Sequence, residues 1–130
     1  MEVKVELNGP IREQEVIALY RSNRWSSLRG SHTLVTARVG GELVGLGNAI
    51  SDGSLVVYYP HLLVHPDHQG KGVGRKIVEV MQRVYGGFHQ QMLTADGKAI
   101  EFYKAVGFER AGKTEPMWVY SAGALRVKCP

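Results

Sequence analysis

Short runs in which apolar and polar residues alternate occupy much of the first half of the chain, and this period of two is typical of strands that bury one face. Residues 3–7 read Val-Lys-Val-Glu-Leu and predict the first such strand, which Asn8-Gly9-Pro10 ends. A helix is predicted from there to about Arg21, and its apolar side consists of Val16, Ile17, Leu19 and Tyr20. The polar segment from Ser22 to Thr33 is interpreted as a loop or a short helix.

A hairpin and a further strand follow in the same alternating pattern. Leu34 to Val39 and Glu42 to Ile50 flank the pair Gly40-Gly41, which is a two-residue turn signal. The turn Asp52-Gly53-Ser54 then leads into a strand that is predicted from Leu55 to about Val64.

Helical spacing replaces alternation in the second half of the chain. The apolar residues of one predicted helix face are Val73, Ile77, Val80, Met81 and Val84. Gly86-Gly87 ends this helix, and Gln91 to Ala95 predicts another strand. Lys98 to Val106 predicts a second helix, which Gly107 ends.

Two short closing strands are predicted after that helix. Phe108 to Ala111 and Met117 to Tyr120 have strand-like composition and are expected to pair as a hairpin, while Ser121 to Pro130 is interpreted as a loose tail. No repeat, linker or low-complexity stretch interrupts the order. The sequence therefore predicts one α/β domain (α+β in the stricter sense) over residues 1–120 and a tail over 121–130.

Composition places the chain among soluble globular proteins. Of its 130 residues 44% are apolar and 22% charged, and the net charge is +4. The basic residues are dispersed rather than clustered, so the sequence gives little support to a nucleic-acid partner. Cys129 is the single cysteine and has no internal disulfide partner, which favours a reducing cytoplasm. The N-terminus lacks the apolar core of a signal peptide, and no segment is apolar enough to span a bilayer.

The most informative motif is the segment Gln69-Gly70-Lys71-Gly72-Val73-Gly74, between a predicted strand and a predicted helix. Glycines allow the backbone to approach a ligand closely, and the unpaired amides at a helix start attract phosphate. Lys71, Arg75 and Lys76 would add positive charge, although these positions also suit an ordinary solvated helix face. The motif therefore predicts a site for a phosphorylated ligand.

Four interpretations of this motif differ in the ligand they assign. Gly70, Gly72 and Gly74 give G-x-G-x-G rather than the dinucleotide pattern G-x-G-x-x-G, and the strand-loop-helix does not stand in a repeated βαβ array. The phosphate-loop pattern of NTPases is absent. A tight connection with glycines for steric reasons alone is the third interpretation. A family resemblance supplies the fourth.

Two motifs resemble those of the GNAT superfamily of N-acetyltransferases. Gln69-x-x-Gly72-x-Gly74 resembles the acyl-coenzyme-A loop Q/R-x-x-G-x-G/A. The segment from Asp96 to Phe108 resembles N-x-x-A-x-x-F-Y-x-x-x-G-F. The resemblance covers about Val3 to Tyr120 and implies a single domain with a mixed central sheet, a splayed pair of parallel strands and flanking helices.

The resemblance implies a binding site for acetyl-coenzyme A, with no metal. The residues it assigns to the coenzyme are Leu62, Leu63, Val64, Gln69, Gly70, Lys71, Gly72, Val73, Gly74, Arg75, Asp96, Lys98 and Phe102. In the family the strand at Leu62 to Val64 splays from its parallel neighbour, so that backbone groups bind the pantetheine arm and polarise the thioester carbonyl. Pro60 independently predicts a bulge or an unpaired edge here, because proline donates no ladder hydrogen bond. Asp96 departs from the family's usual asparagine, and an ionised aspartate cannot donate a hydrogen bond.

Catalytic roles are predicted for Tyr103 and His61. Tyr103 matches the family's tyrosine that protonates the coenzyme A thiolate, although its spacing also suits a core aromatic beside Phe102. His61 is a candidate base, acting directly or through water, and strand alternation is expected to place it on the same face as Tyr59.

The acceptor site is predicted near Trp25, Tyr58 and Tyr59, although Trp25 also suits a plain hydrophobic anchor. His65, His68 and His89 lack the spacing of zinc ligands and are expected at the surface or in turns.

Together these patterns predict a cytoplasmic N-acetyltransferase that moves an acetyl group from acetyl-coenzyme A to a primary amine of a small molecule or protein by direct attack. A non-catalytic acyl-coenzyme-A-binding regulatory module is the alternative, and a nucleic-acid-associated protein is a third class. Homodimers are frequent in the superfamily, so the resemblance allows a homodimer, but no interface can be identified in the sequence.

Overall fold

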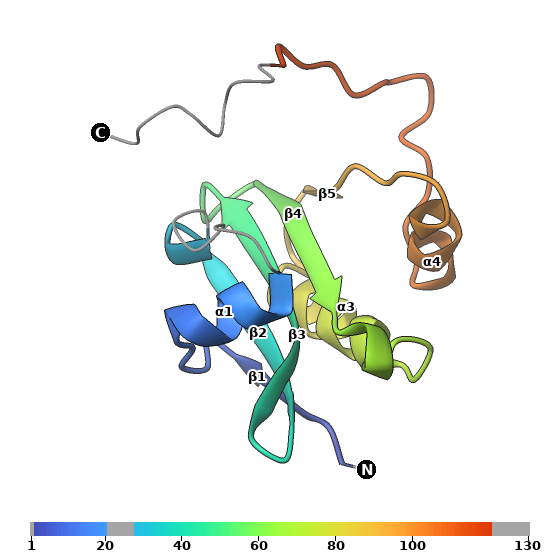
Figure 1. Ribbon diagram of the computed structural model, residues 1–130. Coiled ribbons are helices and arrows are strands. Elements are labelled where there is room, and N and C mark those ends of the chain that lie inside the picture. Colours follow the sequence, from blue (N-terminus) through green and yellow to red (C-terminus); the bar gives the residue numbers. More distant parts are fainter. Residues whose placement is uncertain (1, 21–27, 121–130) are drawn as a thin grey trace.

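The computed structural model describes residues 2–20 and 28–120 (Figure 1). In chain order its elements are β1 (Lys4–Leu7), α1 (Glu13–Tyr20), β2 (Thr33–Val39), β3 (Glu42–Ser51), β4 (Val56–Val64), the 3₁₀ turn η1 (Pro66–His68), α3 (Val73–Val84), β5 (Gln90–Met92) and α4 (Ala99–Ala105). Each predicted strand up to the first long helix is therefore present, within one or two residues of its expected bounds.

The strands form one mixed sheet in the order β1-β2-β3-β4-β5. The first four strands are antiparallel neighbours, and β4 and β5 form the parallel pair. The ladder between β4 and β5 runs only from the pair Val56–Gln90 to the pair Tyr58–Met92, while β4 continues to Val64. β4 thus runs on beyond the last residue pair of the parallel ladder, with no parallel partner for its second half among the described residues, as expected for the predicted splay.

A bulge interrupts β4 at Pro60. Between the register pairs Asn48–His61 and Ile50–Tyr58, β4 holds one residue more than β3. An extra residue of this kind bends a strand and changes the faces of the side chains that follow it. The irregularity that Pro60 predicts is therefore confirmed.

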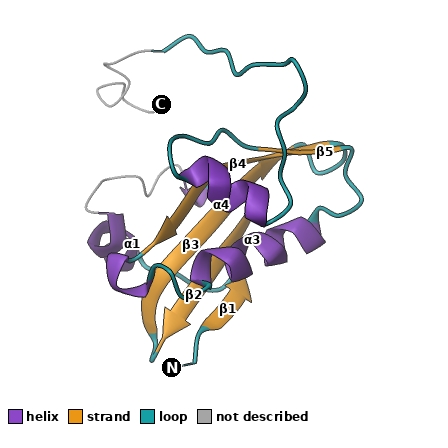
Figure 2. Ribbon diagram, turned by 90° about the vertical axis from the view of Figure 1, so that its right-hand side faces the viewer, coloured by secondary structure: helices purple, strands orange, loops and turns teal. Residues whose placement is uncertain are grey.

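Helices cover both faces of the sheet, and Figure 2 shows α3 and α4 together on one side of it. The core between the sheet and α3 includes Val35, Ala37, Val44, Val57, Val73, Ile77, Met81 and Tyr85. A smaller cluster lies on the α1 side and includes Val16, Leu28, Leu43 and Leu46. Gly45 and Gly47 of β3 allow α3 to pack closely, because a Cβ atom at Gly47 would lie 2.8 Å from Cγ2 of Ile77.

The predicted closing hairpin is wrong for this structure. Neither Phe108 to Ala111 nor Met117 to Tyr120 forms a strand. Met117, Trp118, Val119 and Tyr120 are each at least 69% exposed, and the segment runs away from the sheet at the top of Figure 1. Strand-like composition alone does not fix a strand, because strand stability depends on cross-strand and same-face neighbours. Within residues 2–20 and 28–120, none of the helices has the length and hydropathy that a membrane span needs.

Candidate active site

The glycine loop forms an open cradle at the start of α3. Gly70 and Gly72 have positive φ angles of 76° and 83°, and a Cβ atom on either would meet no atom within 4 Å. Gly72 is the N-cap of α3 and offers no side-chain cap. The amide of Lys76 donates to the carbonyl of Gly72, so the amides before it in α3 have no carbonyl one turn back. These amides and the helix dipole suit a phosphate group.

Gly74, in the first turn of α3, lies close to both the end of β4 and helix α4. A Cβ atom at Gly74 would lie 3.3 Å from the ring of Phe102 and 3.5 Å from Cγ2 of Val64. The second motif is thus packed against the first, with Phe102 as the contact. The ring of Phe102 thus packs against the glycine loop at Gly74.

Gln69 has a structural role in the loop. Its Nε2 donates to the carbonyl oxygen of Val64 at 3.0 Å, which ties the loop to the end of β4. Lys71 and Lys76 are exposed, and Arg75 lies 3.6 Å from Glu79 across one helical turn. Exposed pairs of this kind contribute little to stability, so these cations remain available to an anionic ligand.

Backbone direction along β4 decides which amides point into the splay. The amide of His65 donates to the carbonyl of Val44 on β3. Because successive amides of a strand point to opposite edges, the amide of Leu63 also points to β3, and the amides of Leu62 and Val64 point to the β5 side. The splayed edge therefore presents the two amides that could meet a carbonyl oxygen.

Tyr103 lies on α4, half-buried in a group of aromatic side chains. Its ring centroid is 5.1 Å from that of Phe102 and 5.7 Å from that of Phe108. Burial raises the pKa of the Tyr103 phenol above its ordinary value. The phenol is therefore protonated at neutral pH and able to donate a proton. The packing role and the acid role are compatible.

His61 and Tyr59 lie on opposite faces of β4, so the predicted alternation is wrong at this point. Tyr59 is buried on the α3 side, where Leu62 also packs. The bulge at Pro60 adds one residue between them, which puts His61 on the face of Tyr58. The Tyr59 hydroxyl donates to Oε1 of Gln91 at 2.7 Å. Tyr59 is thus part of the core, and its hydroxyl is engaged with Gln91.

Tyr58 remains exposed on the α1 side of the sheet. Its hydroxyl lies 3.1 Å from Oγ1 of Thr94, beyond the end of β5. Tyr58 and His61 therefore share one face beside the bulge. Trp25, the third predicted acceptor residue, lies outside the described residues.

Two further predicted coenzyme ligands, and one of the histidines expected at the surface or in a turn, stand near the surface. Asp96 and Lys98 are exposed just before α4, and the carbonyl of Asp96 accepts from the amide of Ala99. His65 caps η1, where its Nδ1 accepts from the amide of Asp67 at 3.1 Å. Among the residues that the structure describes, no group of three or more His, Cys, Asp or Glu side chains could hold a metal ion.

The sequence analysis missed a buried polar link beside the bulge. Asn48 of β3 is fully buried; its Nδ2 donates to Oγ of Ser31 and its Oδ1 accepts from the amide of His61, both at 3.0 Å. The available signal was one amide side chain within the otherwise apolar run from Leu43 to Ala49.

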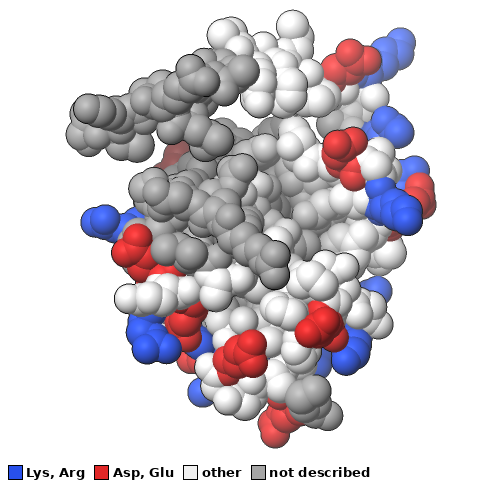
Figure 3. Space-filling view, viewed as in Figure 1, with Lys and Arg blue, Asp and Glu red and all other residues white. Residues whose placement is uncertain are grey.

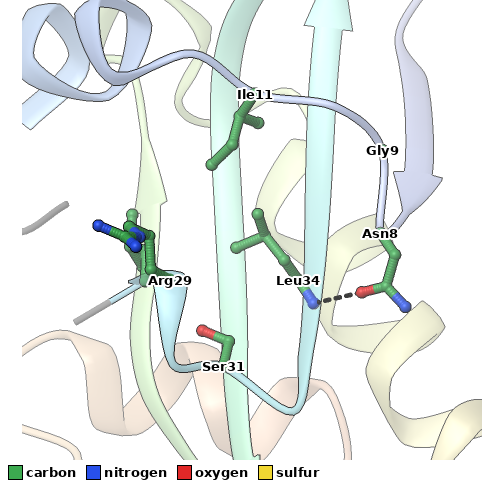
Figure 4. A pocket seen from close by; sticks show the side chains of 7 residues that line it. Asn8, Gly9, Ile11, Arg29, Ser31 and Leu34 are labelled. Carbon is green, nitrogen blue, oxygen red and sulfur yellow. Dashed lines mark hydrogen bonds between the residues drawn. The ribbon is translucent and has the colours of Figure 1, made fainter. Parts of the chain in front are cut away.

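Ser31 also lines a pocket on the α1 side of the sheet, shown in Figure 4. The pocket has a volume of about 250 Å³ and is lined by Asn8, Gly9, Ile11, Leu28, Arg29, Ser31 and Leu34. Oδ1 of Asn8 accepts from the amide of Leu34 at 2.8 Å, which closes one wall. No motif in the sequence singled out this pocket.

On the face in Figure 3, the charged side chains of the described residues do not gather into a stripe of one sign. Basic and acidic residues alternate along the edge where α4 lies, and mostly uncharged surface adjoins them. This face therefore gives no electrostatic support to a nucleic-acid partner.

Solved structures show the same fold. A GNAT-family acetyltransferase from Streptococcus pneumoniae superposes with a TM-score of 0.81 at 23% identity, covering 92% of this chain and 98% of that one. An acetyltransferase from Deinococcus radiodurans gives a TM-score of 0.78 at 21% identity, covering 91% and 87%. The predicted fold class is confirmed.

Relatives in sequence agree with this similarity. Residues 30–110 match the model of the acetyltransferase (GNAT) domain. The chain is 34% identical over 73 residues to the chloroplastic GCN5-related N-acetyltransferase 2 of Arabidopsis thaliana, covering 52% of this chain and 27% of that protein. It is 35% identical over 83 residues to the N-alpha-acetyltransferase RimI of Mycobacterium tuberculosis, covering 60% and 52%. The matched stretches thus span about half or less of these relatives. Since the family model covers more than half of its sequence, this chain belongs to the GNAT acetyltransferase family.

Proposed function

We propose that this protein transfers an acetyl group from acetyl-coenzyme A to a primary amine. The observation that carries the proposal is the position of the β4 splay directly beside the uncapped start of α3. The start of α3 suits a pyrophosphate, and the splayed edge of β4 suits a thioester carbonyl. A dinucleotide loop or a purely steric turn would not need both.

The donor would be held by backbone groups with nearby cations. The amides of Val73, Gly74 and Arg75 would receive the pyrophosphate, and Lys71 would add charge. The fit is supported by the open space at Gly70 and Gly72.

Transfer needs three further contributions from the chain. An amide of the splayed edge, at Leu62 or Val64, would polarise the thioester carbonyl. His61 would take the proton of the attacking amine, directly or through water. As the carbon–sulfur bond breaks, Tyr103 would give a proton to the leaving thiolate; its raised pKa keeps the phenol protonated at neutral pH. Attack would be direct, because the only thiol, Cys129, lies in the last residues of the chain.

The primary amine is supported by the names of relatives. One is an N-alpha-acetyltransferase and another is a histone acetyltransferase. The residues proposed to meet the amine are Tyr58, on the α1 side of the sheet, and Trp25, which lies outside the described residues.

Titration calorimetry tests the donor assignment. Coenzyme A should bind the wild-type chain, whereas NAD⁺ should bind at least tenfold more weakly (about 1.4 kcal/mol). Equal affinity for the two ligands, or no binding of coenzyme A, would contradict the proposal. Binding of coenzyme A without thiol release across an amine panel would instead support the non-catalytic module.

We also infer that the protein is a homodimer in a reducing, cytoplasmic compartment. The exposed apolar run of Met117 to Tyr120 supports the dimer, because soluble monomers rarely expose such contiguous patches. The single cysteine supports the compartment.

A further inference from the structure

Asn48 is a fully buried polar residue in the middle of the sheet, on strand β3. A buried side-chain amide is costly unless its groups find partners. Both sides of this amide have one: Nδ2 donates to Ser31 Oγ, and Oδ1 accepts from the amide of His61. The Asn48 side chain therefore joins the segment of Ser31 to the segment of His61.

The contact with His61 falls at the point where the β4 ladder resumes. Asn48 and His61 are the last register pair before the bulge, and the next pair is Ile50 and Tyr58. The direction of the His61 amide sets the direction of the amides that follow it along the strand. Leu62, the next residue, turns its amide toward the splay. A side-chain bond to His61 therefore fixes where the Leu62 amide points.

The contact with Ser31 anchors the same amide from the other side. Ser31 lies just before β2, at the wall of the pocket in Figure 4. The amide of His32, the next residue, donates to the carbonyl of Ala49, which continues the β2–β3 pairing up to this point. The Asn48 side chain is thus held in one orientation, with its oxygen toward β4.

We infer that Asn48 is a positioning residue that locks the β4 bulge and aims the Leu62 amide at the thioester carbonyl. This inference rests on the proposed acetyl transfer. Asn48 touches neither substrate, so it should affect turnover and leave donor binding almost unchanged. The donor's pyrophosphate would be held by the start of α3, which Asn48 does not contact.

The test compares Asn48→Leu, which keeps the branching and the number of side-chain heavy atoms but has no amide, with the wild type. We expect kcat to fall about 10²-fold, the usual loss when one donor to the developing oxyanion is misplaced. The dissociation constant for coenzyme A, measured by calorimetry, should change less than about threefold, since the pyrophosphate site is separate. In ¹⁵N NMR spectra, the Leu62 amide should respond to acetyl-coenzyme A in the wild type and lose this response in Asn48→Leu.

Two matched controls separate positioning from burial. Thr36→Val removes another fully buried polar group, whose Oγ1 has no hydrogen-bond partner among the described residues, and should leave kcat within about threefold. Asn48→Asp keeps an oxygen that can accept from His61 and from the Ser31 hydroxyl, so it should retain most of the turnover. If Asn48→Leu does not fold, the turnover of Asn48→Asp tests the inference in its place.

The outcomes distinguish the inference from the function it rests on. A wild type that binds no coenzyme A, or releases no thiol with any amine, contradicts the proposed function. An active wild type with an unchanged kcat in folded Asn48→Leu overturns the inference. So does a loss of kcat accompanied by an equal loss of coenzyme A affinity, or a folded Asn48→Asp that is as inactive as Asn48→Leu.

Discussion

The Tyr103 phenol combines burial among aromatic rings with a raised pKa. Tyr103→Phe keeps the ring and removes the proton, so we expect turnover to fall about 10²-fold while coenzyme A affinity stays unchanged. Steady-state kinetics and calorimetry measure the two quantities. Tyr120→Phe, which removes an exposed phenol, is the control. Equal turnover in Tyr103→Phe and the wild type would exclude Tyr103 as the acid.

The pH profile gives a second check on Tyr103. The acid must be protonated to act, so its contribution is complete at low pH and is lost as the pH rises through its pKa. Because burial raises that pKa above 10, Tyr103 should cause no fall in rate between about pH 7 and pH 10. A fall in that range that disappears in Tyr103→Phe would contradict this assignment.

Glu15 and Arg38 form the best-defined ion pair of the structure. Two nitrogens of Arg38 donate to the Glu15 carboxylate at 2.7 and 3.0 Å, and both side chains are about 15% exposed. The hydrogen bond from Arg38 lowers the pKa of Glu15 from 4.5 to about 2. A depressed pKa stabilises the folded chain above pH 4.5, and this stability is lost as the pH falls toward 2.

Glu15→Gln should therefore lower the free energy of unfolding by about 2 kcal/mol at pH 7. The difference from the wild type should shrink as the pH approaches 2. Urea denaturation at pH 7 and pH 3 measures it, and Glu101→Gln, at an exposed pair, should have little effect. A difference that does not depend on pH would show that the carboxylate charge is not the source.

Side-chain types in the sequence were enough to name candidate site residues, but not to predict which way those side chains face. Tyr103 and Phe102 could be found because their motif lies on one continuous helix. The faces of His61 and Tyr59 could not, because one extra residue at Pro60 reverses the alternation that the prediction relied on. Asn48 forms its hydrogen bonds with residues distant in sequence. A local sequence pattern does not reveal such contacts.

At the scale of elements, the glycine loop and the start of α3 carry the donor assignment. Gly72→Ala would put a Cβ atom on a residue with φ of 83°, at a cost of about 1–2 kcal/mol. Since the strain would distort the amides at the helix start, coenzyme A should bind roughly tenfold more weakly in calorimetry. Gly112→Ala carries similar strain at φ of 63°, in an exposed turn elsewhere. Equal affinity for coenzyme A in the Gly72→Ala and Gly112→Ala variants would show that the glycine loop does not bind the coenzyme.

The strands show which elements a sequence determines locally. Alternating residues and turn glycines were enough to predict the hairpin of β2 and β3. The missing amide hydrogen of Pro60 was enough to predict the bulge in β4. The segment from Met117 to Tyr120 has strand-like residues too, yet it lies exposed. Whether such residues form a strand depends on cross-strand and same-face neighbours, which the sequence of the segment alone does not specify.

At the scale of the whole molecule, that exposed segment predicts self-association. Light scattering coupled to gel filtration should give a mass near twice 14.4 kDa. Trp118→Ser removes the largest exposed side chain of the run and should shift the protein toward the monomer. Glu109→Ser, at an exposed charged residue nearby, is the control. A monomeric wild type at high micromolar concentration would contradict the dimer.

The fold class, although not the chain after α4, could be predicted from two motifs and their order, because the loop and α4 pack against each other at Gly74 and Phe102. The acceptor could not be predicted in the same way. Its residues come from separate segments, and Trp25 lies outside the described part of the chain.

The central claim is that the loop and the splayed strand together serve acetyl transfer. The most direct measurement is release of coenzyme A thiol from acetyl-coenzyme A across a panel of primary amines, from polyamines and amino acids to peptides with free N-termini or lysines. The account predicts amine-dependent release with at least one class, reduced about 10²-fold in Tyr103→Phe. Coenzyme A binding without release from any amine, or release that Tyr103→Phe leaves unchanged, would contradict it.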